Sequence, residues 1–129
     1  MKVAIIGSRS FENYELLKFK LLPYKASITE IVSGGASGAD KLAEIYAKAN
    51  NIPVKVFEAD WENLDAEPCK IKTRQDGSSY NVLAGFNRNT KIVQRADFII
   101  CFWDGQSTGT RDSLKKAHGF KKDILIIYF

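Results

Sequence analysis

Three glycine-rich loops, each lying between an apolar run and a stretch with helical spacing, constrain the fold of this chain most. They occupy residues 7–10, 33–40 and 104–110. Runs rich in Val, Ile and Phe are typical of buried strands, so each loop is predicted to be a strand-to-helix turn. Because α/β proteins bind ligands at the carboxyl edge of a parallel sheet, the three loops predict one shared binding site.

Five apolar runs are predicted to form the strands. The fourth and fifth are almost continuously apolar, which indicates burial on both faces, as in a parallel sheet covered by helices. The predicted strands are Val3–Gly7, Thr29–Ser33, Val54–Phe57, Asp97–Trp103 and Ile124–Phe129. Their alternation with helices predicts an α/β fold, a doubly wound parallel sheet of about five strands with helices on both faces.

Apolar residues at helical spacing predict four helices between these strands. The first is expected to stop at Pro23, and the second to end at Asn50–Pro53. The third is expected over Val82–Arg95. The fourth is expected over Thr108–His118, with Gly119 as its closing residue.

Residues 58–80 break the alternation and are predicted to be an insertion, because they are too long for an ordinary connection and too polar for a buried helix. Alternation over 69–73 and the turn signal Asp76-Gly77 predict a short hairpin. This hairpin is a candidate lid over the site. The whole chain of 129 residues is predicted to be a single domain.

Composition narrows the classes of function. The net charge is +4, but the basic residues are spread along the chain, which favours a mixed solvated surface over a dedicated nucleic-acid tract. The N-terminal apolar run is too short for a signal peptide or a membrane span, so a cytoplasmic protein without a membrane partner is expected. Cys69 and Cys101 lack the spacing of metal ligands, and neither a metal nor a cofactor is expected.

The loops suit an anionic ligand, because glycine permits close approach of the backbone and a helix N-terminus favours negative charge. Arg9 is expected to grip a phosphate or carboxylate, or else to pair with a nearby acid in its turn. Asp40 is expected to complement a helix dipole, or to accept a hydrogen bond from a ribose or from the loop at Ser8. Ser107 and Thr110 supply more hydroxyls than helix capping needs, so phosphate binding is favoured there.

A polar cluster, Asn87–Asn89, is predicted at the start of the third helix, where Arg88 either points into the crevice or is solvated. Trp61 and Trp103 are the candidates for stacking on a base, and Trp61 is the better one, because an aromatic residue that ends a buried strand, as Trp103 does, more often belongs to the core. The predicted ligand-binding residues are Gly7, Ser8, Arg9, Gly34, Gly35, Ser37, Asp40, Arg88, Asn89, Asp104, Ser107, Gly109 and Thr110.

Taken together, residues 7–9, 33–40, 84–89 and 102–110 resemble the YpsA-related branch of the SLOG superfamily. This superfamily also holds the Lonely Guy phosphoribohydrolases and the DNA-processing protein A family. The resemblance spans nearly the whole chain and implies a Rossmann-like sheet. It further implies a protein that senses or processes nucleotide-derived ligands, often beside phage-related or conflict systems.

The resemblance to the Lonely Guy enzymes also implies candidate catalytic residues. Arg88 matches their arginine, and Gly109-Thr110 matches part of their phosphate loop. The position of their catalytic glutamate falls on Ser113, with Asp112 one residue earlier. Arg88 and Asp112 are therefore the candidate catalytic residues, and the missing glutamate leaves open whether the chain is an enzyme.

The sequence favours binding of a phosphate-bearing, nucleotide-derived small molecule, in order to sense, carry or sequester a signal such as an ADP-ribose or cyclic nucleotide. One alternative is hydrolysis of the N-glycosidic bond of a nucleoside 5'-monophosphate. A second is binding of single-stranded nucleic acid. A homo-oligomer is also expected, because relatives commonly associate through helices of this fold.

Overall fold

The computed structural model describes residues 1–65 and 69–129. Its centre is a five-stranded sheet in which every neighbouring pair is parallel, in the order β3-β2-β1-β6-β7. The strands are β1 (Lys2–Gly7), β2 (Glu30–Ser33), β3 (Val54–Val56), β6 (Phe98–Trp103) and β7 (Asp123–Tyr128). Each bound lies within one residue of the prediction, and the α/β, Rossmann-like fold is confirmed.

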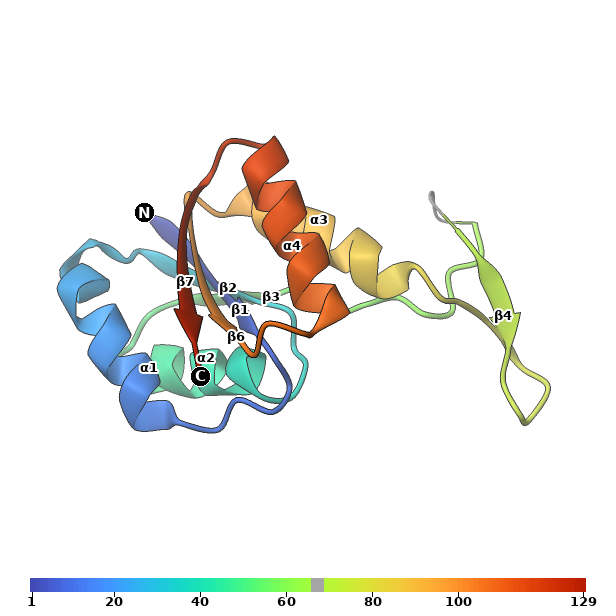
Figure 1. Ribbon diagram of the computed structural model, residues 1–129, viewed down its shortest axis with the longest axis horizontal. Coiled ribbons are helices and arrows are strands. Elements are labelled where there is room, and N and C mark those ends of the chain that lie inside the picture. The colour runs from blue at the N-terminus through green and yellow to red at the C-terminus, as the bar shows by residue number, and fades with distance from the viewer. Residues whose placement is uncertain (66–68) are drawn as a thin grey trace.

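Helices cover both faces of the sheet (Figure 1). They are α1 (Tyr14–Leu21), α2 (Ala39–Ala49), α3 (Ala84–Arg95) and α4 (Thr108–Gly119), with a 3₁₀ helix, η1 (Leu22–Ser27), after α1. Alternate residues of β1 point to opposite faces. Val3 and Ile5 pack in the core beneath α1 and α2, whereas Ala4 and Ile6 pack beneath α3 and α4.

The ends of α2 and α4 both carry a left-handed residue. The helix α2 ends at Ala49, directly before the predicted stop at Asn50, and Asn51 reverses the chain, with the Ile52 N–H donating to the Ala47 carbonyl at 2.8 Å. The prediction that Gly119 closes α4 is wrong. Gly119 is the last helical residue, and Lys121 adopts the left-handed conformation two residues later. The reversal lies at Lys121 because β7 begins at Asp123, and the Lys122 N–H then reaches the Ala117 carbonyl at 2.9 Å.

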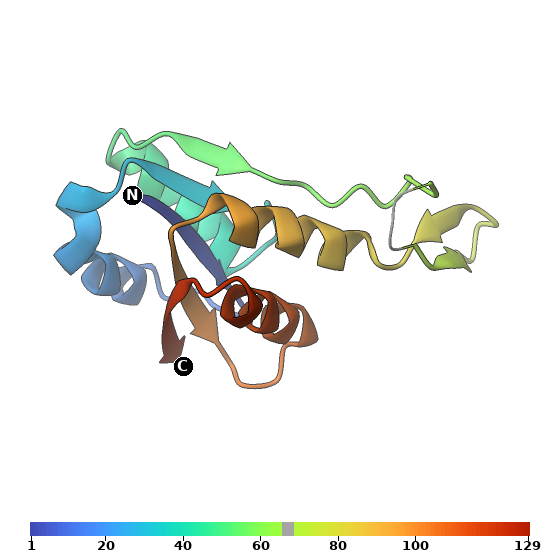
Figure 2. The ribbon, with the colours of Figure 1, turned by 90° about the horizontal axis from the view of Figure 1, so that it is seen from above.

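The predicted hairpin is present within the insertion over 58–80, of which residues 66–68 lie outside the described residues. Its antiparallel strands are β4 (Ile71–Thr73) and β5 (Ser79–Asn81), and Gly77 in the turn has a φ of 88°. The hairpin extends away from the sheet in both views (Figures 1 and 2). Trp61 and Val82, at the base of the insertion, line the cavity at the strand ends, and a lid function stays a prediction.

No helix in the described part of the chain is long and apolar enough to cross a membrane.

Candidate functional site

A cavity of about 520 Å³ lies at the carboxyl ends of β1 and β6, where the order of the strands changes direction. Open α/β sheets bind ligands at this point, and the volume is typical of a small-molecule site. The walls come from the loops after β1 and β6, from the first turns of α2, α3 and α4, and from the base of the insertion.

Gly7 and Ser8 hold the loops after β1 and β6 together. A Cβ at Gly7 would collide with the carbonyl oxygen of Phe102, so only glycine permits this approach of the two strands. The Ser8 N–H donates to that same carbonyl at 2.9 Å. The buried Ser8 hydroxyl accepts from the Asp104 N–H at 3.1 Å and thereby fixes the position of the Asp104 loop.

Gly34 provides the space in which Arg88 reaches the loop after β2. The Arg88 guanidinium donates to the Gly34 carbonyl at 2.6 Å and, through Nε, to Asn89 Oδ1 at 3.0 Å. A Cβ at Gly34 would lie 2.8 Å from Asp40 Oδ2 and 2.9 Å from Arg88 Nη1. Asp40 and Arg88 are therefore close neighbours, brought together from α2 and α3.

The three charged side chains Asp40, Arg88 and Arg9 at the cavity differ in their burial and in their hydrogen-bond partners. Burial raises the pKa of Asp40 to about 6, although Arg88 and a hydrogen bond from the Ala36 N–H favour the ionised carboxylate. Burial also lowers the pKa of Arg88. Arg9 is exposed at the cavity, and its guanidinium makes no hydrogen bond or ion pair with any described residue. Arg9 is thus a cation available to a ligand.

The loop after β6 is organised around the start of α4. Asp104 Oδ1 accepts from the N–H groups of Gln106 and Ser107, each at 2.8 Å, and these bonds hold the pKa of Asp104 below its usual range. Ser107 is the N-cap, accepting from the Thr110 N–H at 3.4 Å and from its hydroxyl at 3.1 Å. The hydroxyls of Ser107 and Thr110 therefore both take part in capping α4, whereas the sequence analysis favoured phosphate binding for them.

The first turn of α4 still offers hydrogen-bond donors. The N–H groups of Thr108 and Gly109 find no partner within the ranges 1–65 and 69–129. Both residues line the cavity. Free N–H groups at a helix N-terminus, together with the positive end of the helix dipole, favour an anion.

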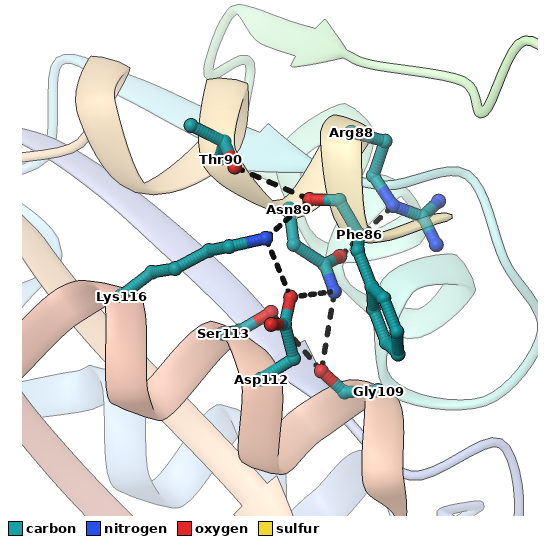
Figure 3. Close-up of polar contacts among 8 residues, drawn as sticks. All are labelled: Phe86, Arg88, Asn89, Thr90, Gly109, Asp112, Ser113 and Lys116. Carbon is teal, nitrogen blue, oxygen red and sulfur yellow. Dashed lines mark hydrogen bonds and ion pairs between the residues drawn. The ribbon is translucent and has the colours of Figure 1, made fainter. Parts of the chain in front are cut away.

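Asn89, on α3, connects to α4 (Figure 3). Its Nδ2 donates to the Gly109 carbonyl and to Asp112 Oδ2, both at 3.2 Å. Asp112 also accepts from Lys116 Nζ at 2.7 Å, and the Lys116 ammonium donates in addition to the Phe86 carbonyl. The carboxylate of Asp112 is thus paired with a cation, and Asp112 is not among the residues that line the cavity.

Most of the predicted ligand-binding residues line this cavity. They are Gly7, Ser8, Arg9, Asp40, Arg88, Asn89, Asp104, Ser107, Gly109 and Thr110. Gly34, Gly35 and Ser37 lie in the loop after β2 and are not among the lining residues. Binding of a ligand by any of these residues stays a prediction.

The apolar part of the cavity is less evident in the sequence. Trp61, a stacking candidate, lines the cavity together with Val82 and Phe86, which the prediction omits. Phe86 and Asn89 are three residues apart and therefore lie on the same face of α3, which is the signal that identifies Phe86. Trp103 is not a lining residue and packs instead against Tyr128.

Across the two described stretches, no three His, Cys, Asp or Glu side chains are arranged to hold a metal ion. Cys101 is buried in β6, where burial raises the pKa of its thiol to about 12, so the thiol stays protonated near neutral pH. Cys69 donates a hydrogen bond to the Leu64 carbonyl.

Comparison with known proteins identifies similar sequences and folds. Residues 1–64 match the sequence model of the YAcAr family, described as the YspA, cpYpsA-related SLOG family. This match includes the loops after β1 and β2. No curated protein sequence matches the chain significantly.

Two solved structures of DNA processing protein A share the fold. The protein from Streptococcus pneumoniae matches with a TM-score of 0.73 and 19% identity, over 97% of this chain and 49% of that chain. The protein from Helicobacter pylori, whose structure is described with a single-stranded DNA binding mode, matches with a TM-score of 0.67 and 21% identity, over 98% of this chain and 64% of that chain. This chain therefore spans only about half to two thirds of their length.

Proposed function

Because the chain belongs to the YpsA-related branch of the SLOG superfamily, we propose that it binds a phosphate-bearing, nucleotide-derived small molecule at the carboxyl ends of β1 and β6. Binding would serve to sense, carry or sequester a nucleotide signal. ADP-ribose and cyclic nucleotides are representative ligands of this class.

One observation carries the proposal. Arg9, whose guanidinium has no hydrogen-bond or ion-pair partner in the described part of the chain, lines the same cavity as the unpaired N–H groups of Thr108 and Gly109. A guanidinium and a helix N-terminus are complementary to a phosphate, since both supply N–H donors and positive charge. Among the described residues, no carboxylate lies close enough to Arg9 to form an ion pair, although the charge of Arg9 attracts that of Asp40, so the guanidinium keeps its donors for an anion.

Hydrolysis of a nucleoside monophosphate is supported less well. The candidate acid Asp112 is paired with Lys116 and Asn89 outside the cavity lining. Two carboxyl groups, Asp40 and Asp104, line the cavity. Asp40 lies beside Arg88, and its raised pKa is of the kind that general acid/base catalysis uses, whereas the pKa of Asp104 is lowered. We therefore expect any turnover of AMP to disappear in Asp40→Asn and to persist in Asp112→Asn, with free base followed by chromatography.

Single-stranded nucleic acid is a second candidate ligand. It is favoured by the fold shared with DNA processing protein A and by the net charge of +4. Binding to a phosphate backbone weakens steeply with salt, because counterions are released. Oligonucleotide titrations at several salt concentrations distinguish this candidate from a small molecule that occupies the cavity.

The proposed function is tested with two variants. Arg9→Ala removes the free cation, and Gly109→Val adds a side chain where a Cβ meets no atom within 4 Å, so the fold accommodates it. A ligand at a hundred times its dissociation constant should stabilise the parent protein by about 2.7 kcal/mol. We expect both variants to lose this stabilisation in thermal unfolding with nucleoside monophosphates and ADP-ribose.

The matched control is Gly119→Val, at the opposite end of α4, where a Cβ also meets no atom within 4 Å. This variant should keep the full thermal shift. Mass spectrometry of small molecules released from the purified, heat-denatured protein identifies the natural ligand. An undiminished shift in both Arg9→Ala and Gly109→Val contradicts the proposed site.

A further inference from the structure

Trp61 is held at the point where the insertion leaves and rejoins the domain. Its carbonyl accepts from the Asn81 N–H at 2.6 Å, and this hydrogen bond joins the two ends of the insertion. Asn81 is fully buried, and its Oδ1 accepts from the N–H groups of Lys70 and Leu83 at 3.2 and 3.0 Å. The backbone that carries Trp61 is thereby fixed at the cavity.

The Trp61 ring lies against the first turn of α3. A Cβ at Gly85 would stand 3.3 Å from Cη2 of the indole, which means that glycine at this position makes room for the ring. Trp61 remains 38% exposed and Phe86 37% exposed, although both line the cavity. Aromatic surface is left uncovered here, within reach of a ligand.

The two tryptophans differ in their surroundings. Trp103 stacks at a tilt on Tyr128, with a centroid distance of 5.9 Å, and its Nε1 donates to the Ser107 carbonyl at 3.2 Å. The Arg111 guanidinium also lies 5.8 Å from the centre of the Trp103 ring. Trp103 is therefore occupied by the protein, and Trp61 is the tryptophan available to a ligand.

The cavity thus combines two chemistries. Trp61, Val82 and Phe86 supply apolar surface from the base of the insertion and the start of α3, whereas Arg9 and the first turn of α4 supply donors and positive charge. A sugar phosphate complements only the second set. A nucleotide complements both, because its base is planar and apolar on its faces and its phosphate is anionic.

We propose that Trp61 is a specificity-determining residue that stacks on the nucleobase of the ligand. This inference rests on the proposed function, since it assumes that the anionic part of the ligand binds near Arg9. Phe86 forms a second aromatic wall of the base site. The insertion therefore contributes to ligand selection through its base rather than through its tip.

The test compares ligands with and without a base. AMP, GMP, CMP, UMP and ribose 5-phosphate are titrated calorimetrically into the parent protein, Trp61→Ala and Trp61→Phe. Loss of base stacking typically weakens affinity by roughly 5- to 150-fold. We expect Trp61→Ala to weaken the preferred mononucleotide by this factor, Trp61→Phe to restore most of the affinity, and ribose 5-phosphate to bind all three proteins equally.

Fluorescence supplies a second readout, because the chain has two tryptophans. In Trp103→Phe, which leaves Trp61 as the reporter, the mononucleotide should quench emission, whereas in Trp61→Phe it should leave the emission of Trp103 unchanged. Equal weakening of mononucleotide and ribose 5-phosphate by Trp61→Ala, or no weakening of either, overturns the stacking role alone. Failure of the parent protein to bind any of these phosphates overturns the stacking role, and the absence of a thermal shift with ADP-ribose as well overturns the proposed function.

Discussion

Asp40 is a carboxyl group whose environment changes its affinity for a proton. Its ordinary pKa is 3.8, and burial in the folded protein raises this value to about 6. The folded state therefore binds more protons than the unfolded state between these two values. By linkage, the contribution of Asp40 makes the folded protein less stable as the pH rises through this window.

We expect this effect to amount to about 3 kcal/mol, since each pKa unit corresponds to about 1.4 kcal/mol. Asp40→Asn removes the titrating group and should flatten the dependence. The measurement is urea unfolding of parent and variant from pH 4 to pH 7, with the difference in unfolding free energy plotted against pH. A difference that stays constant over this range contradicts the buried, proton-binding carboxyl.

At the scale of elements, the hairpin of β4 and β5 is separate from the sheet. Its two strands pair with each other in a sheet of their own. The two ends of the insertion are joined by the hydrogen bond from the Asn81 N–H to the Trp61 carbonyl. A two-stranded hairpin adds little stability by itself. Replacement of residues 62–80 by two glycines should therefore change the unfolding free energy by about 1 kcal/mol or less.

This prediction is checked by urea unfolding and by circular dichroism of the shortened protein. Native helical content with a nearly unchanged midpoint is the expected result. Asn81→Ala in the full chain is an informative comparison, because it leaves the N–H groups of Lys70 and Leu83 without their acceptor. Loss of cooperative unfolding in the shortened protein contradicts the view of the hairpin as a separate element.

At the scale of the whole molecule, β7 is an edge strand of the five-stranded sheet, and its outer side pairs with no other strand in the described residues. Ile126 is 38% exposed and Tyr128 64% exposed on this strand, and the segment 124–129 contains neither lysine nor proline to discourage pairing. We expect a homodimer or a larger assembly, in keeping with the closed symmetry of most soluble oligomers.

Light scattering at micromolar protein concentration measures the mass of the assembly. The expected mass is at least twice that of the 14.5 kDa chain, and Ile126→Lys should shift it toward the monomer. Phe19→Lys, a change of an exposed apolar residue on α1, is the control that should leave the mass unchanged. A single species of 14.5 kDa in the parent protein contradicts the prediction.

The sequence by itself determined the strands, three of the helix ends and the hairpin, because these features depend on local chemistry. Apolar runs mark the five strands, Pro23 cannot continue α1, and Asp76-Gly77 fits a tight turn. The sequence also predicted that the glycine-rich loops meet at one edge of the sheet, since loops that follow parallel strands lie at the same edge.

Only the tertiary structure decided which side chains line the cavity. Ser107 caps α4, Asp112 pairs with Lys116 and Asn89, and Trp61 reaches the cavity while Trp103 packs on Tyr128. The left-handed residue after α4 is Lys121, whereas the sequence predicted that Gly119 closes this helix. These outcomes depend on which face each helix turns toward the cavity and on contacts between segments far apart in the chain. Residue spacing alone determines neither of them.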